Sequence, residues 1–360
     1  MQQPPACLTA GEKVPNFTLP DAAGTLRVFY NELRGGPVIL AAFSDLREVQ
    51  QDGTLRKLSE LAPGLADQGA EIFAVATRSV AGQALPFPLF ADPQGAALAQ
   101  LLAAEPPVFP ATTAVVPKVC LYALDPNQRV LAAFRQPAPE AQVERALEVL
   151  SCWRNAQMQP QILPQGAPVL ILPKVLEPAL CERLIKLWHD GGHKEGSVSD
   201  GTRNVYAPDT KKNLEHVIQD PELSQHISFT MARRIGPELS KVFNFNAPFR
   251  FEVHIVLSYE DHRQDFFGIH RDNLRPDSPR MFAASTNLND DFEGGALYFP
   301  EYGPHGYRPP AGGSAVFSCN LLHEARPVTR GQRFAMTSFF CLADKPVDKY
   351  PADKRRQMQV

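Results

Sequence analysis

Three residues in the C-terminal half of the chain could together hold a metal ion. His270 and Asp272 stand two apart in the run FFGIHRDN, and His323 follows in NLLHEARPVTRGQRF. If the first run is a β-strand, side chains two apart point to the same face, so one imidazole and one carboxylate can meet at a single point. Two imidazoles and one carboxylate, with further positions open, form the facial triad of non-haem Fe(II) oxygenases. The spacing therefore predicts an iron site with His270, Asp272 and His323 as ligands.

Two other interpretations fit the same three residues: a hydrolytic Zn²⁺ site with the same donors, and ordinary strand histidines beside a surface Asp. A basic residue after the second histidine favours the iron site over both. Arg333 lies ten residues after that histidine, in the run RFAMTSFF, which is typical of a strand. A metal hydrolase does not need a buried guanidinium, whereas an oxygenase that binds a dicarboxylic acid needs a cation, and the planar fork of arginine matches a carboxylate. Ala335 and Thr337 share its face of the strand, which leaves small side chains beside it. The competing Arg326 and Arg330 fall in the preceding turn.

Short motifs surround these residues in a recognisable order. A Gly-Gly step precedes a Phe-Pro strand end, the second histidine is followed by Glu, and a Pro-Val step leads to the basic residue: Gly294-Gly295, Phe299-Pro300, His323-Glu324 and Pro327-Val328. With them, residues 169–342 resemble the catalytic domain of 2-oxoglutarate- and Fe(II)-dependent dioxygenases of the prolyl 4-hydroxylase type. The combination is far more specific than any one motif. It predicts a double-stranded β-helix, the jelly-roll, with flanking helices near residues 178–190 and 223–243.

The resemblance also implies the cofactors and the residues that bind them. Fe(II), 2-oxoglutarate as cosubstrate and O₂ are expected, with ascorbate as a further candidate. Arg333 would hold the far carboxylate of 2-oxoglutarate together with Tyr259, which ends the alternating run EVHIVLSY; the other interpretation of Tyr259 is a core residue whose hydroxyl is satisfied elsewhere. Asn287 and Thr337 are candidates to line the same pocket, although Asn287 could equally face solvent.

For the reaction, the resemblance implies hydroxylation of a protein or peptide side chain, prolyl by analogy. Hydroxylation of a free amino acid or another small metabolite is the alternative, and a non-catalytic sensor of 2-oxoglutarate or oxygen is a third interpretation, which an intact ligand set disfavours. The polar stretch 196–213 lies ahead of the predicted β core, where loops often carry substrate contacts. Arg203 and Tyr206 are candidates for this role, and a plain surface loop fits as well.

The N-terminal part alternates strand and helix patterns. Apolar runs at 37–43, 71–77, 119–124 and 130–134 predict strands, and the patterns at 55–65, 95–103 and 139–150 predict helices. This order resembles a thioredoxin-like α/β domain, and the opening GEKVPNFTLPDAAGTLRVF is most similar to a peroxiredoxin. The region where that family carries its nucleophilic Cys, residues 44–58, contains none; Cys7 precedes the fold, and Cys120 falls in a predicted strand. We therefore expect a non-catalytic scaffold or docking domain.

Length and composition complete the outline. The 360 residues predict two domains: a thioredoxin-like domain at 1–155, a linker at 156–166, a dioxygenase domain at 167–345 and a polar tail at 346–360. A net charge of -3 gives no footprint for nucleic acid or an anionic membrane. No apolar run approaches the roughly 18 residues that span a bilayer, and the first residues lack the pattern of a secretory signal. Six scattered cysteines indicate free thiols in a reducing compartment, with the cytoplasm as the expected location. The sequence leaves the oligomeric state open, with a homodimer as one candidate.

Overall fold

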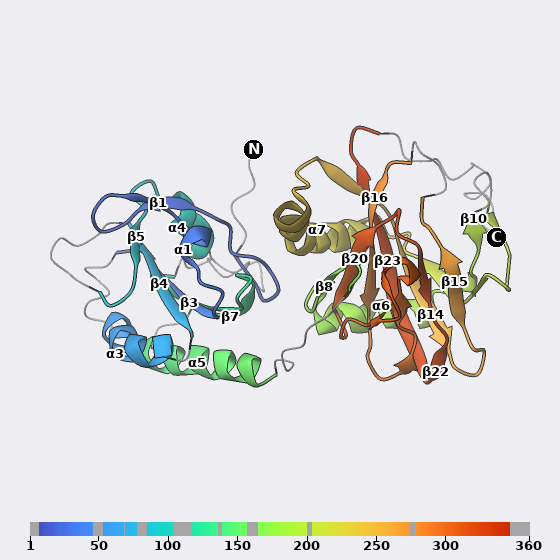
Figure 1. The fold of residues 1–360 in the computed structure, drawn as a ribbon, viewed down its shortest axis with the longest axis horizontal. Coiled ribbons are helices and arrows are strands. Elements are labelled where there is room, and N and C mark those ends of the chain that lie inside the picture. Colours follow the sequence, from blue (N-terminus) through green and yellow to red (C-terminus); the bar gives the residue numbers. More distant parts are fainter. Residues whose placement is uncertain are drawn as a thin grey trace. The chain divides into compact units, whose positions relative to one another are not determined.

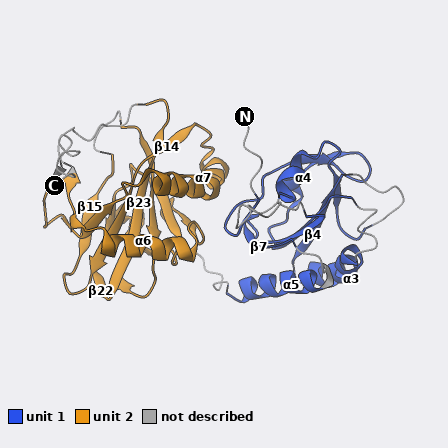
Figure 2. Ribbon diagram, turned by 180° about the vertical axis from the view of Figure 1, so that it is seen from behind, with its two compact units in different colours: residues 1–160 blue, residues 161–360 orange. Residues whose placement is uncertain are grey.

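The structure is a computed structural model that describes residues 7–45, 53–67, 69–77, 85–103, 117–135, 139–156, 165–199, 204–273 and 278–345. It divides into two compact units, residues 1–160 and 161–360 (Figure 2). The division falls within the stretch predicted as a linker, of which residues 157–164 lie outside the described ranges, as does the predicted tail at 346–360. Among the described residues, no helix combines the length and apolarity needed to cross a membrane.

The first unit is built on a five-stranded sheet with the order β5-β4-β3-β6-β7. Its strands β3, β4 and β5 are parallel, whereas β6 and β7 run antiparallel to their neighbours. A hairpin of β1 and β2 comes before the sheet. The elements are β1 Thr18–Pro20, β2 Leu26–Val28, α1 Phe29–Glu32, β3 Val38–Phe43, α3 Thr54–Asp67, β4 Glu71–Ala76, β5 Leu89–Ala91, α4 Ala96–Leu101, β6 Val119–Leu124, β7 Val130–Phe134 and α5 Pro139–Asn155.

Helices pack on both faces of this sheet. α3 and α5 lie along one face (Figure 1), where Leu58 and Val143 enter one apolar core, and α1 and α4 contribute Phe29 and Leu101 to a second core on the other face. Every residue of the central strand β3 is buried, as expected of a strand covered on both sides. This is the thioredoxin-like fold that the sequence predicts. Cys120 is fully buried in β6, where desolvation raises the pKa of its thiol to about 11.

The second unit is a jelly-roll of two antiparallel sheets, one with the order β8-β20-β16-β23-β14-β13-β9 and one with the order β12-β15-β21-β18-β19. Two short pairs, β10 with β11 and β17 with β22, complete it. The elements are β8 Leu170–Leu172, α6 Pro178–Asp190, β9 Lys194–Glu195, β10 Val198–Ser199, β11 Asn204–Val205, β12 Lys211–Lys212, β13 Leu214–Val217, α7 Pro221–Phe243, β14 Phe249–Glu260, β15 Phe266–His270, β16 Arg280–Asn287, β17 Glu293–Gly294, β18 Leu297–Tyr298, η1 Pro300–Tyr302, β19 Gly306–Tyr307, β20 Ser314–Ser318, β21 His323–Ala325, β22 Val328–Arg330 and β23 Gln332–Leu342.

Helices α6 and α7 cover the larger sheet (Figure 1). Leu184 of α6 and Met231 of α7 pack with Val256 of β14 in the main apolar core of this unit. The start of α7 is set by Asp220, whose carboxylate accepts hydrogen bonds from the backbone N–H groups of the first turn, and Pro221 occupies the position where a missing N–H is tolerated. The helices therefore stabilise one face of the sheet and leave its other face to the interior of the jelly-roll.

Gly294 and Gly295 adopt φ values of +74° and +60° and turn the chain between β17 and β18. One sequence-based expectation differs from this structure. Residues 196–213 were expected to be a loop, yet short strands form at β10, β11 and β12. Hydrogen bonding to neighbouring strands outweighs local polarity there, which a sequence pattern does not report.

Candidate metal centre

Two adjacent strands bring the histidines together. His270 is the last residue of β15, His323 is the first residue of β21, and the two are direct partners across the sheet, with ring centroids 4.2 Å apart. Asp272 lies beyond the end of β15, so the strand-periodicity argument for its orientation was wrong. Its backbone N–H instead donates to the carbonyl of Cys319 at 3.1 Å, which folds the chain back toward His323. The tertiary contact achieves the convergence that strand spacing was expected to give.

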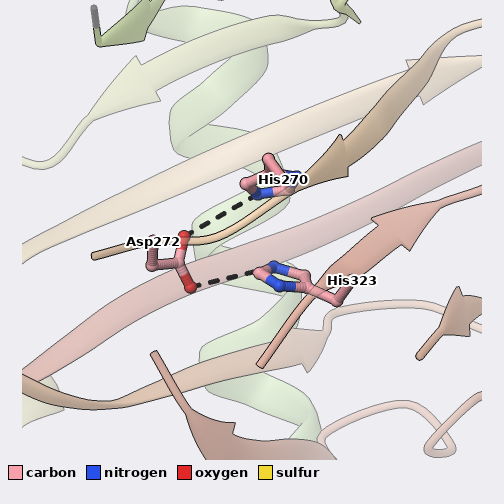
Figure 3. Close-up of side chains that lie close together, drawn as sticks. All are labelled: His270, Asp272 and His323. Atoms are coloured by element: carbon pink, nitrogen blue, oxygen red, sulfur yellow. Dashed lines mark ion pairs between the residues drawn. The ribbon is translucent and has the colours of Figure 1, made fainter. Parts of the chain in front are cut away.

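The three ligand groups face a common point (Figure 3). Nε2 of His270 lies 3.7 Å from Oδ1 of Asp272, and Nε2 of His323 lies 3.7 Å from Oδ2 of the same carboxylate. One donor atom from each residue falls within 4.8 Å of the others, the only such group of three or more among the described residues. Nδ1 of each imidazole is engaged by a backbone carbonyl, that of Gly268 at 2.8 Å and that of Leu321 at 3.0 Å. This assigns the proton to Nδ1 and leaves both Nε2 lone pairs for a metal.

The surroundings of His270 favour its neutral form. Burial, followed by the neighbouring His323, lowers the pKa of His270 to about 4. The ring of Phe267 stacks on His270 with centroids 3.5 Å apart, and the ring of Phe317 meets His323 edge-on at 4.7 Å. A neutral imidazole is the form that binds a metal. These donors therefore fit a divalent metal with two nitrogen ligands and one carboxylate ligand.

Arg333 lies inside the same jelly-roll, on β23. It is 2% exposed; its Nε donates to Oδ1 of Asn287 at 3.0 Å, and a terminal nitrogen donates to Oγ of Ser285 at 3.2 Å. Its guanidinium lies 5.4 Å from the centroid of the Tyr259 ring. Burial lowers the pKa of Arg333, and within the described part of the chain no carboxylate pairs with it. A buried cation without an anion is costly, so this position suits an anionic ligand.

The rival arginines are placed differently. Arg326 and Arg330 lie near the surface, with side chains 51% and 76% exposed, and they form ion pairs with Glu324 and Glu293 respectively. Neither is available to a buried cosubstrate.

The other residues predicted for the cosubstrate pocket surround Arg333. Tyr259 is its direct partner across β14 and β23 and is 3% exposed, and burial raises the pKa of its hydroxyl. Thr337 lies on the same strand face, half-buried and opposite Ser285. Asn287 is fully buried, and its amide is occupied at both ends, by Arg333 and by the carbonyl of Pro309 at 2.7 Å. Asn287 thus orients the guanidinium. The sequence analysis missed Ser285, which stands two residues before Asn287 on β16 and shares its face of that strand.

Of the two residues predicted to contact substrate, one lies outside the described part of the chain and the other at the surface, and several other polar residues of this unit have structural partners. Arg203 lies outside the described residues, and Tyr206 is 61% exposed. His254 is buried between the hydroxyls of Ser228 and Ser338, at 2.8 and 2.7 Å. Arg271 forms an ion pair with Glu301, and Asn273 forms hydrogen bonds with Arg280 and Asn320. His305 lies at the surface, and Cys319 is buried in an apolar cluster.

Comparison with known proteins identifies the family. No family model matches the chain. A PKHD-type hydroxylase of Beijerinckia indica is 41% identical over 197 residues, covering 50% of this chain and 80% of that protein. Another from Acinetobacter baylyi is 31% identical over 159 residues, covering 40% of this chain and 64% of that protein. The chain belongs to the PKHD-type hydroxylases, which confirms the resemblance drawn from the motifs.

Two kinds of solved structure align with parts of this chain. A prolyl-4-hydroxylase from Pseudomonas putida aligns with a TM-score of 0.39 and 20% identity, covering 48% of this chain and 91% of that chain. A peroxidoxin from Mycobacterium tuberculosis, BcpB, aligns with a TM-score of 0.35 and 24% identity, covering 42% of this chain and 99% of that chain.

Proposed function

We propose that this protein is an Fe(II)- and 2-oxoglutarate-dependent dioxygenase that hydroxylates a protein or peptide side chain, prolyl by analogy. The observation that carries the proposal is the pairing of an open His-Asp-His ligand set with a buried, carboxylate-free guanidinium in one jelly-roll. A continuous path of contacts connects the ligand set with the guanidinium. Phe267 stacks on His270 and packs against the buried cluster that contains Tyr259, and the Arg333 guanidinium lies over the Tyr259 ring.

Each of these residues has a role in the proposed reaction. His270, Asp272 and His323 would hold the metal, and bound Fe(II) with 2-oxoglutarate and O₂ supplies the oxidation that places one oxygen atom on a C–H carbon of the substrate. Arg333 would orient 2-oxoglutarate by a charge-assisted hydrogen bond to its far carboxylate. The hydroxyl of Tyr259 stays protonated because burial raises its pKa, so it can donate to the same carboxylate. Thr337 would line the pocket.

The residues around this pocket prepare it in advance. Asn287 and Ser285 hold the Arg333 guanidinium in one orientation before any cosubstrate arrives, which avoids an ordering cost on binding. Phe292 and Val328 pack with Tyr259 and keep water from the pocket wall. Gly295 must be small, because a Cβ there would lie 3.0 Å from Cδ of Arg333. The fold thus supplies orientation and a dry wall.

We propose a non-catalytic role for the first unit, as a docking or scaffold domain. The thiols of Cys7 and Cys120 are buried, and burial raises the pKa of Cys120 to about 11, far from the thiolate needed for peroxide chemistry. All six cysteines are free thiols, which supports a reducing compartment such as the cytoplasm. A homodimer and a requirement for ascorbate are further proposals that follow from the family.

The test is aerobic turnover of 2-oxoglutarate by the full chain with added Fe(II). We expect succinate release, stimulated by a pool of peptides and accompanied by peptides heavier by one oxygen atom in mass spectrometry. Stimulation by free amino acids alone would show the small-metabolite alternative. A chain that binds neither Co(II), used as a spectroscopic substitute for Fe(II), nor 2-oxoglutarate is not a dioxygenase.

A further inference from the structure

Three polar side chains alternate along the edge of the jelly-roll interior: Lys211, Asn213 and Glu215, here called the polar row. They are 8%, 0% and 7% exposed. Asn213 stands between the end of β12 and the start of β13, and its neighbours Lys212 and Leu214 are less buried than the three residues of the polar row, so the three side chains point inward together. Glu215 is the direct strand partner of Leu257, which packs with Tyr259 in the buried cluster described above.

The polar row lies beside the proposed metal centre. Nζ of Lys211 is 4.6 Å from the centroid of the Phe267 ring, and that ring stacks on the ligand His270 at 3.5 Å. Lys211 also forms an ion pair with Glu215, with Nζ and Oε1 2.5 Å apart. The two charges of the polar row therefore neutralise each other. The side-chain amide between them, that of Asn213, is the group of the polar row that can form hydrogen bonds with a ligand.

Within the described part of the chain, the side-chain amide of Asn213 has no hydrogen-bond partner: both Oδ1 and Nδ2 are buried and unpaired. This is a costly state that native structures rarely keep without a reason. The strap of residues 194–199 lies directly over it: a Cβ on Gly196 would lie 1.9 Å from Oδ1 of Asn213 and 3.2 Å from Oε1 of Glu215. The strap is attached through the N–H of Gly196 to the carbonyl of Asn213 at 2.8 Å and through Nζ of Lys211 to the carbonyl of Ser197 at 3.4 Å.

The ligand that fits this amide has one donor and one acceptor side by side. In an extended peptide, the N–H and C=O of one residue point to the same side, matching the acceptor Oδ1 and donor Nδ2 of a carboxamide. A free amino acid would instead bring two full charges, and burial of charges requires charged partners, which in the polar row are already paired. The observations therefore favour a peptide main chain.

We propose that Asn213 binds the main chain of an extended peptide substrate. Lys211 and Glu215 flank the amide, and entry of the peptide requires displacement of the strap of residues 194–199, which covers the amide. This inference rests on the proposed dioxygenase function and deepens it, because it names a residue that binds the main chain of the peptide substrate.

The test replaces Asn213 with leucine, which keeps the size and removes both hydrogen-bonding atoms. We expect the melting temperature of Asn213→Leu to equal or exceed that of the wild type, because the unpaired polar atoms are gone. Binding of Co(II) and of 2-oxoglutarate should be unchanged. Oxidation of a pool of acetylated, amidated peptides of randomised sequence should fall about tenfold or more, as expected for two lost hydrogen bonds. Asn246→Leu, at an exposed asparagine beyond the end of α7, is the matched control and should retain wild-type peptide oxidation.

The outcomes separate this inference from the function on which it rests. A wild-type protein that binds neither Co(II) nor 2-oxoglutarate overturns both. A wild type that binds and consumes 2-oxoglutarate but oxidises only free amino acids, or no peptide at all, overturns the peptide assignment alone. Wild-type peptide oxidation in Asn213→Leu, or a lower melting temperature that Asn213→Ala shares, shows a structural asparagine and also overturns the inference.

Discussion

Replacing Arg333 with alanine should weaken the binding of 2-oxoglutarate and leave the metal site intact. The guanidinium is 2% exposed and held by Asn287 and Ser285, so its fork is oriented in advance and shielded from water. A charge-assisted hydrogen bond contributes about 1.5–3 kcal/mol, which corresponds to a dissociation constant for 2-oxoglutarate roughly ten- to a hundredfold higher. Arg333→Lys keeps the charge but loses the fork, so its dissociation constant should fall between those of the wild type and Arg333→Ala.

Anaerobic titration of 2-oxoglutarate into the Co(II)-loaded protein measures this directly. Arg330→Ala is the matched control, because Arg330 is 76% exposed and pairs with Glu293 at the surface; its dissociation constant should equal that of the wild type. Binding of Co(II) itself should be the same in all three variants, since Arg333 contacts none of the proposed ligands. If Arg333→Ala binds 2-oxoglutarate as tightly as the wild type does, the assignment of the pocket is wrong.

Two further predictions concern the proposed metal ligands and His254. His270→Ala or Asp272→Ala should abolish succinate release and Co(II) binding, because one of three ligands is lost; retention of full Co(II) affinity by either variant would contradict the ligand set. Burial lowers the pKa of His254 to about 4 from 6.5, so the unfolded chain takes up a proton below pH 6.5 that the folded protein takes up only near pH 4. The free energy of unfolding should therefore be fully retained above pH 6.5 and fall by about 3 kcal/mol as the pH drops to 4. In His254→Asn, the free energy of unfolding measured by denaturant titration should depend less steeply on pH across this range, by one proton. An unchanged pH dependence would contradict the lowered pKa of His254.

The sequence predicted the elements whose pattern is local. The buried strand β3, the amphipathic helices α3 and α6 and the long strand β23 follow from runs of apolar residues at strand or helix spacing. The inward direction of Arg333 follows from the same periodicity, since it shares a face with Ala335 and Thr337. Such features depend on residues near each other in the chain, so a pattern can report them.

Features that depend on contacts between distant segments were not accessible in this way. Asp272 reaches the metal centre through the carbonyl of Cys319 and not through strand spacing. The sequence alone allowed Asn287 to face either the pocket or solvent, and the structure shows that it faces Arg333 of β23. The stretch that contains Asn213 was expected to be a polar loop, but the strap of residues 194–199 covers Asn213 through Gly196 and buries it. Chemical identity and periodicity are properties of the sequence itself; burial and partnership depend on what the rest of the fold brings alongside each residue, and for this protein only the tertiary structure determined them.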